Sequence, residues 1–210
     1  MIRDLILEYN KKKHEIRRKL KEFKLVWSNS DKKVFSELCF CICTPQSKAV
    51  YCDKAISGLE KNSILFKGTS RQIKSGLKTV RFPNNKAGYI IKARKLFTVN
   101  GTIRVKDRVN VDNIPETRQW FVRNVKGIGF KEASHFLRNI GFGKDFAILD
   151  VHILRNMIKH GIIHEIPKNI SKTAYFILEN KLRKFSEKIK IPMDELDLLF
   201  WFAETGRILK

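Results

Sequence analysis

Acidic residues are scarce in this sequence. Only 21 of its 210 residues are Asp or Glu, against 43 Lys and Arg, which gives a formal net charge of +22 at pH 7 and a pI near 10.0. A balance this basic argues against a basic partner and favours a polyanion, of which nucleic acid comes first. The basic residues are spread along the chain rather than held in one tail, so we expect a folded basic surface.

Long apolar runs are also missing. No stretch approaches the length of a membrane span, and the apolar part of the opening MIRDLILEYNKKK is too short for a signal peptide. We therefore expect an intracellular protein of the cytoplasm and nucleoid. Hydrophobic residues still make up 43% of 210 residues, enough for one large or two small domains with a real core.

Cysteine is confined to a short part of the chain. The four cysteines are Cys39, Cys41, Cys43 and Cys52, and an intracellular setting argues against a disulfide framework. The spacing C-x-C-x-C puts the middle residue on the opposite face of a helix. Ordinary small core residues are therefore favoured over a zinc site.

Apolar periodicity predicts an all-α protein. We expect helices over 2–26, 34–43, 86–97, 114–125, 153–160, 171–188 and 193–206, and another opening at Thr44-Pro45, with Thr44 as N-cap and Pro45 at the first helical position. Residues 59–85 break into short helices or loops. Residues 99–110 could form a short strand or hairpin, but we expect an extended loop because nothing else reads as a sheet partner.

The most informative stretch is VKGIGFKEASHFLRNIGFGKDFAILDVH, residues 125–152. Gly127 and Gly129 permit a sharp turn, and the apolar residues after it fall on one helix face: Ala133, Phe136, Leu137 and Ile140. A glycine turn at a helix N-terminus can bind a phosphodiester through its N–H groups. The alternative is a plain αα-hairpin without a ligand.

Two charged residues in this stretch also have two interpretations. Lys131 in the first turn of its helix is either a solvated side chain or an amine that a low-dielectric cleft makes nucleophilic. Asp150 is either an N-cap for the helix from Val151 to Lys159 or a carboxylate that stabilises a developing positive charge.

Together these residues carry a family resemblance. The pattern Gly-x-Gly-x-Lys, followed about twenty residues later by Asp-x-His, resembles the helix-hairpin-helix DNA glycosylase superfamily. The segments LDLLFWFAETGRILK and LCFCICTPQSKA resemble more narrowly the archaeal-type, second class of 8-oxoguanine DNA glycosylases. The resemblance implies a two-domain helical fold with the active site in the interdomain cleft. One domain would be discontinuous, from residues 1–30 and 151–210, and the other would span residues 31–150.

The resemblance also implies roles for individual residues. Lys131 would be the Schiff-base nucleophile and Asp150 the catalytic carboxylate. The remaining assignments are DNA-phosphate contacts by Gly127, Gly129 and His152, filling of the DNA gap by Gln46, and base recognition by Trp201, the terminal carboxylate of Lys210 and His135. For Gln46, His135 and Trp201, an ordinary polar, core or surface position is the alternative.

The implied activity is base-excision repair by a bifunctional glycosylase and abasic-site lyase. The expected partner is double-stranded DNA containing 8-oxoguanine, bound by a monomer. We expect no metal and no iron–sulfur cluster, because no cysteine follows Cys52; a monovalent cation at the hairpin is the one ion considered. The alternatives are a non-enzymatic helix-hairpin-helix DNA-binding module and a glycosylase for another lesion, such as an oxidised pyrimidine.

Overall fold

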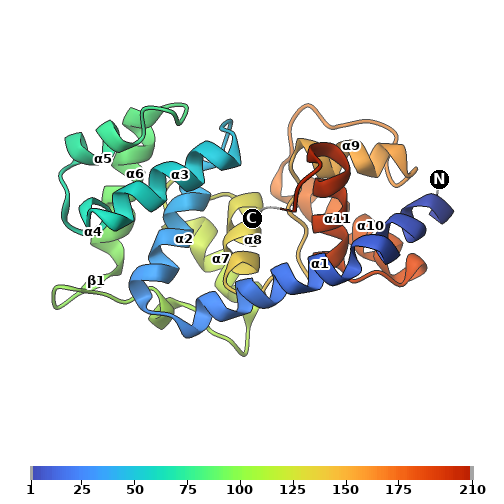
Figure 1. Cartoon of the computed structure of the whole chain (residues 1–210), viewed down its shortest axis with the longest axis horizontal. Helices are drawn as coiled ribbons and strands as arrows, with labels where there is room; N and C mark the ends of the chain where they lie inside the picture. The colour runs from blue at the N-terminus through green and yellow to red at the C-terminus, as the bar shows by residue number, and fades with distance from the viewer. Residues whose placement is uncertain (1, 209–210) are drawn as a thin grey trace.

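Helices provide almost all of the regular structure in residues 2–208, the part of the chain that this computed structural model describes (Figure 1). The eleven α-helices of that part are α1 Ile2–Ser28, α2 Asp31–Cys43, α3 Ala49–Lys61, α4 Ile64–Lys67, α5 Ser70–Gly76, α6 Pro83–Phe97, α7 Ile114–Asn124, α8 Phe130–Asn139, α9 Val151–Lys159, α10 Lys172–Ile189 and α11 Met193–Thr205. Two short strands and one turn of 3-10 helix complete it: β1 Thr98–Val99, β2 Thr102–Ile103 and η1 Lys106–Arg108. The all-α prediction is confirmed.

The extended loop predicted for residues 99–110 is wrong. Thr98 pairs with Ile103 and Val99 with Thr102 in an antiparallel hairpin. The turn between the strands is Asn100-Gly101, with φ values of +49° and +76°. Asn-Gly suits such a two-residue turn, and a hairpin supplies its own pairing partner. A sheet partner elsewhere in the sequence was therefore not needed.

The helix predicted to open at Thr44 and Pro45 begins later. Thr44 is the C-cap of α2, where its hydroxyl donates to the Cys41 carbonyl at 2.9 Å. Helix α3 starts only at Ala49, and Gln46 between the helices has a left-handed backbone with φ of +55°. The local Thr-Pro pattern is overridden here by contacts from a distant helix, which are described below.

Apolar side chains gather into two hydrophobic clusters. The first cluster is formed by residues between Val34 and Phe146, from α2 to α8 and their connections. The second cluster joins Leu5, Tyr9, Ile16 and Phe23 of α1 to residues between Ala147 and Phe200. In Figure 1, α1 runs along the lower side of the molecule, from α9–α11 on the right toward α2. The exact division into domains stays a prediction, and these clusters support it.

Two buried arginine pairs connect the clusters. Arg118 of α7 donates to both carboxylate oxygens of Glu179 in α10, at 2.6 and 2.9 Å. Arg138 of α8 donates to Asp197 of α11 at 2.6 Å. All four side chains are nearly inaccessible to solvent. Removing one partner from such a pair leaves an uncompensated buried charge, at a cost of about 3–5 kcal/mol.

None of the helices in residues 2–208 combines the length and apolar character that a membrane crossing requires.

The second cluster has a titratable group at its edge. The ring of His160, at the C-terminus of α9, stacks on Phe200 with ring centroids 5.4 Å apart and an interplanar angle of 4°. Burial lowers the pKa of His160, and the positive charge of Lys159 adds to this lowering. The folded protein therefore favours the neutral imidazole.

We predict that His160 makes folding stability depend on pH. Because its folded pKa lies below the unfolded value of 6.5, the unfolded chain takes up the proton first as pH falls. The contribution is fully present above pH 6.5 and is lost during acidification below it. In urea unfolding at pH 7.5 and pH 5.5, His160→Phe should lose less stability between the two pH values than the wild type. His164→Phe, at an exposed position, is the control variant. An unchanged pH dependence in His160→Phe would contradict the assignment.

Candidate active site

The glycine hairpin lies between α7 and α8, as the sequence predicted. The Ile128 N–H donates to the Val125 carbonyl at 3.2 Å and closes the turn. Gly127 has φ of +87°, and a Cβ atom added to it would lie 2.5 Å from Cδ2 of Tyr89 in α6. Gly127 is thus required twice, by the left-handed backbone and by the close approach of the Tyr89 ring.

Lys131 is the second residue of α8, and its side chain is 22% exposed. Its Nζ lies 3.5 Å from Oε1 of Glu132. The other oxygen of Glu132 accepts from the Gly129 N–H at 3.1 Å, so the N–H group predicted to contact phosphate already has an internal partner. The remaining N–H groups in the first turn of α8 have no intrahelical acceptor, as at any helix N-terminus.

Lys131 also lies within electrostatic range of Lys86. Burial lowers the pKa of Lys86, and the positive charge of Lys131 contributes to that lowering. Lys86 itself donates to the Pro45 carbonyl, directly beside Gln46. Lys86 was not predicted as a functional residue, because its hydrogen-bond partners are distant in the chain.

Asp150 caps α9. Its Oδ1 accepts from the N–H groups of His152 and Ile153, both at 2.9 Å. Within residues 2–208, its second carboxylate oxygen has no hydrogen bond and the group forms no ion pair with Lys131. The cap and the catalytic interpretation are therefore compatible, since each uses a different oxygen.

Two residues of α10 hold the segment that leads to Asp150. Glu179 accepts from the Ala147 N–H at 2.9 Å, and the Tyr175 hydroxyl donates to the Ala147 carbonyl at 2.6 Å. Burial raises the pKa of Tyr175. The position of Asp150 is thus set by α10 as well as by α9. Neither residue was predicted from the sequence, where both belong to an unremarkable amphipathic helix.

His152 and Trp201 come together at the start of α9. Their rings meet edge to face, with centroids 4.8 Å apart and an interplanar angle of 80°. The Nδ1 atom of His152 lies 3.7 Å from Glu204 Oε2, and Asn156 donates to the other Glu204 oxygen at 3.2 Å. The indole Nε1 of Trp201 is buried without a hydrogen-bond partner in the described part of the chain. A bound water or ligand acceptor would satisfy this donor, and the role of Trp201 in base recognition stays a prediction.

His135 and Lys210 are the other residues predicted to contact the base. His135 is 7% exposed, and its ring packs edge to face on Phe40 with centroids 5.5 Å apart. Lys210 lies outside the described residues. The last residue that is described, Ile208, packs against the second cluster.

Gln46 is exposed and has a left-handed backbone, and a residue on the adjoining turn shares both features. Phe82, the N-cap residue of α6, is 47% exposed and also has a left-handed backbone, with φ of +57°. The Arg81 N–H donates to Ser47 Oγ at 3.0 Å, so the turns that carry Gln46 and Phe82 are hydrogen-bonded to each other. Phe82 was missed in the sequence because exposure and backbone conformation are properties of the fold.

The four cysteines are core thiols. All are buried, and Cys52 Sγ donates to the Cys43 carbonyl at 3.2 Å. Burial raises the pKa of Cys52 to about 11. Within residues 2–208, no group of three or more His, Cys, Asp or Glu side chains has an arrangement that could hold a metal ion.

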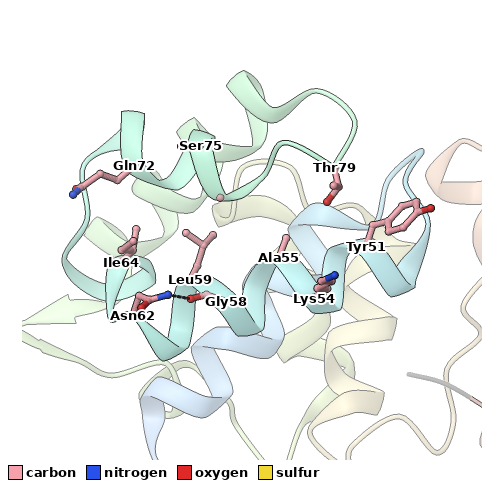
Figure 2. Close-up of a pocket in the computed structure, with 11 residues that line it drawn as sticks. Tyr51, Lys54, Ala55, Gly58, Leu59, Asn62, Ile64, Gln72, Ser75 and Thr79 are labelled. Carbon is pink, nitrogen blue, oxygen red and sulfur yellow. Dashed lines mark hydrogen bonds between the residues drawn. The ribbon is translucent and has the colours of Figure 1, made fainter.

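A separate pocket of about 600 Å³ lies between α3 and α5 (Figure 2). Leu59, Ala55 and Ile64 line it together with small and polar side chains, and Asn62 donates to the Gly58 carbonyl at its edge at 2.9 Å. None of its lining residues belongs to the hairpin, α8 or α9. This pocket is therefore distinct from the candidate active site.

The arrangement defines a class of protein. A glycine hairpin, a lysine at the N-terminus of its second helix and an aspartate capping the next helix occur together in an all-helical fold. These are the features of the helix-hairpin-helix DNA glycosylases.

Comparison with known proteins identifies the family. A family model described as 8-oxoguanine DNA glycosylase matches residues 16–191. The 8-oxoguanine DNA glycosylase/AP lyase of Fusobacterium nucleatum is 45% identical over 204 residues, covering 96% of this chain and 94% of the relative. That of Methanocaldococcus jannaschii is 36% identical over 201 residues, covering 93% and 91%.

Solved structures agree over the whole chain. The Methanocaldococcus jannaschii 8-oxoguanine glycosylase/lyase in complex with 15mer DNA containing 8-oxoguanine gives a TM-score of 0.90 at 36% identity, covering 100% of this chain and 99% of that one. The 8-oxoguanine DNA glycosylase of Thermotoga maritima gives 0.88 at 34% identity, covering 100% and 98%. The chain belongs to the 8-oxoguanine DNA glycosylase family, as the sequence motifs indicated.

We predict that Gly127→Ala destabilises the protein more than Gly101→Ala. Both glycines have positive φ, but a Cβ atom at Gly101 would meet nothing within 4 Å, whereas one at Gly127 would collide with Tyr89. The left-handed backbone costs about 1–2 kcal/mol at either position, so the excess in Gly127→Ala measures the collision. Urea unfolding of the two variants gives the comparison. Equal losses would show that the Tyr89 ring moves aside freely.

Proposed function

We propose that this protein is a bifunctional enzyme of base-excision repair, acting in the nucleoid. It would remove 8-oxoguanine from double-stranded DNA and then cleave the strand at the abasic site. The observation that carries the proposal is the pair formed by Lys131 in the first turn of α8 and Asp150 at the N-cap of α9, with one carboxylate oxygen of Asp150 left over from capping. The names of the relatives support the substrate.

DNA binding follows from charge and from the hairpin. A net charge of +22 attracts a polyanion over a large part of the surface. The first-turn N–H groups of α8, the Gly127 turn and His152 would contact phosphates near the damaged nucleotide. Gly129 would join them only where phosphate displaces the Glu132 carboxylate.

Chemistry at C1′ requires the base to leave the stack, at a cost of a few kcal/mol. Gln46 and Phe82 are exposed side chains on adjoining turns, suited to occupy the vacated space. Polar and apolar residues that enter a duplex in this way offset part of the unstacking cost.

The extruded base would lie against Trp201. The buried Nε1–H of Trp201 needs an acceptor, and the carbonyl oxygens of 8-oxoguanine are acceptors. His135, whose ring packs on Phe40, is the other side chain that we propose to lie against the base.

Base release leaves positive charge on the sugar, which the free oxygen of Asp150 would stabilise. The base departs with the electron pair of the N-glycosidic bond and takes a proton from solvent. Lys131, in its neutral form, bonds to C1′ through the nitrogen lone pair. The C1′–O4′ bond then opens as one of the two amine protons passes to O4′, and the other proton stays on nitrogen in the protonated Schiff base. Loss of a proton from C2′ then expels the 3′-phosphate.

The nucleophile can be tested by borohydride trapping. Lys131→Gln should still bind a duplex containing 8-oxoguanine but should form no covalent complex under borohydride, because no Schiff base forms. Lys126→Gln removes the same charge from the exposed hairpin loop and should cross-link normally. Cross-linking of Lys131→Gln at the wild-type level would refute the assignment.

The same assay separates the alternative functions when it includes a panel of lesions. A non-enzymatic DNA-binding module would give no trapped complex with any duplex. A glycosylase for another lesion would be trapped on an oxidised pyrimidine in preference to 8-oxoguanine.

Asp150 can be tested apart from its capping role. Asp150→Asn keeps an oxygen able to accept from the His152 and Ile153 N–H groups, so its melting temperature should change little. Its single-turnover excision rate should fall by on the order of 100-fold, because the charge is lost. Ser171→Ala is the matched control, since it removes the cap of α10 and should cost about 1 kcal/mol of stability while leaving the rate of the folded enzyme unchanged. Near-normal excision by Asp150→Asn would reduce Asp150 to a cap.

A further inference from the structure

Lys86 is a buried lysine that the proposed chemistry does not use. It lies in the first turns of α6 and is 4% exposed. Lysine is almost never buried unless its charge is satisfied, because desolvating an ammonium group is costly. Its surroundings therefore have to supply an acceptor for each of its protons.

The three acceptors all come from one turn. The Nζ of Lys86 donates to the Cys43 carbonyl at 2.6 Å, the Pro45 carbonyl at 2.7 Å and Ser47 Oγ at 2.9 Å. This turn follows the C-terminus of α2, where carbonyl groups lack helical partners and the helix dipole favours a cation. An ammonium with three donors matches the site completely.

The turn held in this way has a strained residue at its tip. Gln46 lies between two of the acceptors, is exposed, and keeps a left-handed backbone with φ of +55°. A non-glycine residue keeps such a conformation only when the surrounding structure imposes it. Here Lys86 contacts the residues on both sides of Gln46, and the Ser47 N–H also closes the turn by donating to the Thr44 carbonyl at 3.0 Å.

Phe82 is linked to the same ammonium through Ser47. The bond that the backbone N–H of Lys86 donates to the Phe82 carbonyl, at 3.1 Å, is an ordinary helical bond of α6 and does not involve the ammonium. Ser47, which accepts from Lys86, also accepts from the Arg81 N–H at 3.0 Å. Two exposed side chains with left-handed backbones, from segments far apart in the sequence, are thus tied to one buried cation.

We propose that Lys86 is a positioning residue that holds Gln46 and Phe82 in one fixed arrangement for entry into the DNA duplex. The inference rests on the proposed function, because it requires a protein that opens DNA. Without the Lys86 ammonium, the turn at Gln46 relaxes out of the left-handed conformation, and its side chain is no longer held beside the turn that carries Phe82. Affinity for a duplex with a vacant base position then falls, since the tip has to be ordered during binding.

The test is a double-mutant cycle with Lys86→Met and Gln46→Ala. The readout is the affinity for a duplex with a tetrahydrofuran abasic analogue, divided by the affinity for the undamaged duplex. Each single variant should lower this ratio about tenfold, and the double variant should lower it no further, because Lys86 acts through Gln46. Lys78→Met removes an exposed charge eight residues before Lys86 and should weaken binding to both duplexes equally, leaving the ratio unchanged. Additive losses in the cycle would overturn the proposal.

A second cycle covers the case in which Lys86→Met does not fold, as melting temperature would reveal. Ser47→Ala removes one acceptor of Lys86 and the link to Arg81 while keeping two carbonyl acceptors. Ser47→Ala should lower the ratio less than tenfold. Combined with Gln46→Ala, it should lower the ratio no further than Gln46→Ala alone. Additive losses in this cycle would also overturn the proposal. Since neither readout contains 8-oxoguanine, failure of the wild type to excise that base refutes the proposed function separately.

Discussion

The buried pair between Arg118 and Glu179 is the interaction on which the geometry of the site depends. It joins α7, the first helix of the hairpin, to α10 of the second cluster, and Glu179 also receives the Ala147 N–H. The Arg118 guanidinium lies 4.0 Å from the centroid of the Phe146 ring, which closes the space around it. One carboxylate thus relates the hairpin to the segment that ends in Asp150. Buried ion pairs add little net stability compared with apolar packing, but an arrangement that separates the partners leaves an uncompensated buried charge.

The second buried pair does the same for α8. Arg138 is two turns after Lys131 on the same helix, and its partner Asp197 belongs to α11, which also carries Trp201. Burial raises the pKa of Asp197, whereas the charge of Arg138 favours its ionised form. Lys131, the proposed nucleophile, and Trp201, the proposed base contact, are therefore placed on helices that one ion pair connects. Both arginine pairs lie in the core, so the exposed groups of the site can change partners without loosening the scaffold.

Local patterns predicted the parts of this protein that local physics determines. The span of α9 followed from an N-cap aspartate, and the buried face of α8 from apolar residues spaced at helical intervals. The predicted start of α3 was wrong because Thr44 and Pro45 form a local helix-start pattern. In the folded chain, Lys86, 41 residues beyond Pro45, donates hydrogen bonds to the carbonyl groups of this turn. The roles of Tyr175 and Phe82 in the site were likewise invisible, since both depend on partners or exposure that only the folded chain defines.

The scarcity of acid acquires a structural meaning in the folded chain. Glu179 and Asp197 are paired with buried arginines. Glu195 accepts from the Tyr9 hydroxyl at 2.6 Å and from Arg17 at 3.0 Å. Each of these carboxylates is withdrawn from the surface, where it would repel phosphate. The acids that remain exposed are fewer than the composition suggests, while most lysines stay at the surface. The interior therefore uses acidic residues to orient the site, and their removal from the surface leaves a more uniformly basic exterior for DNA.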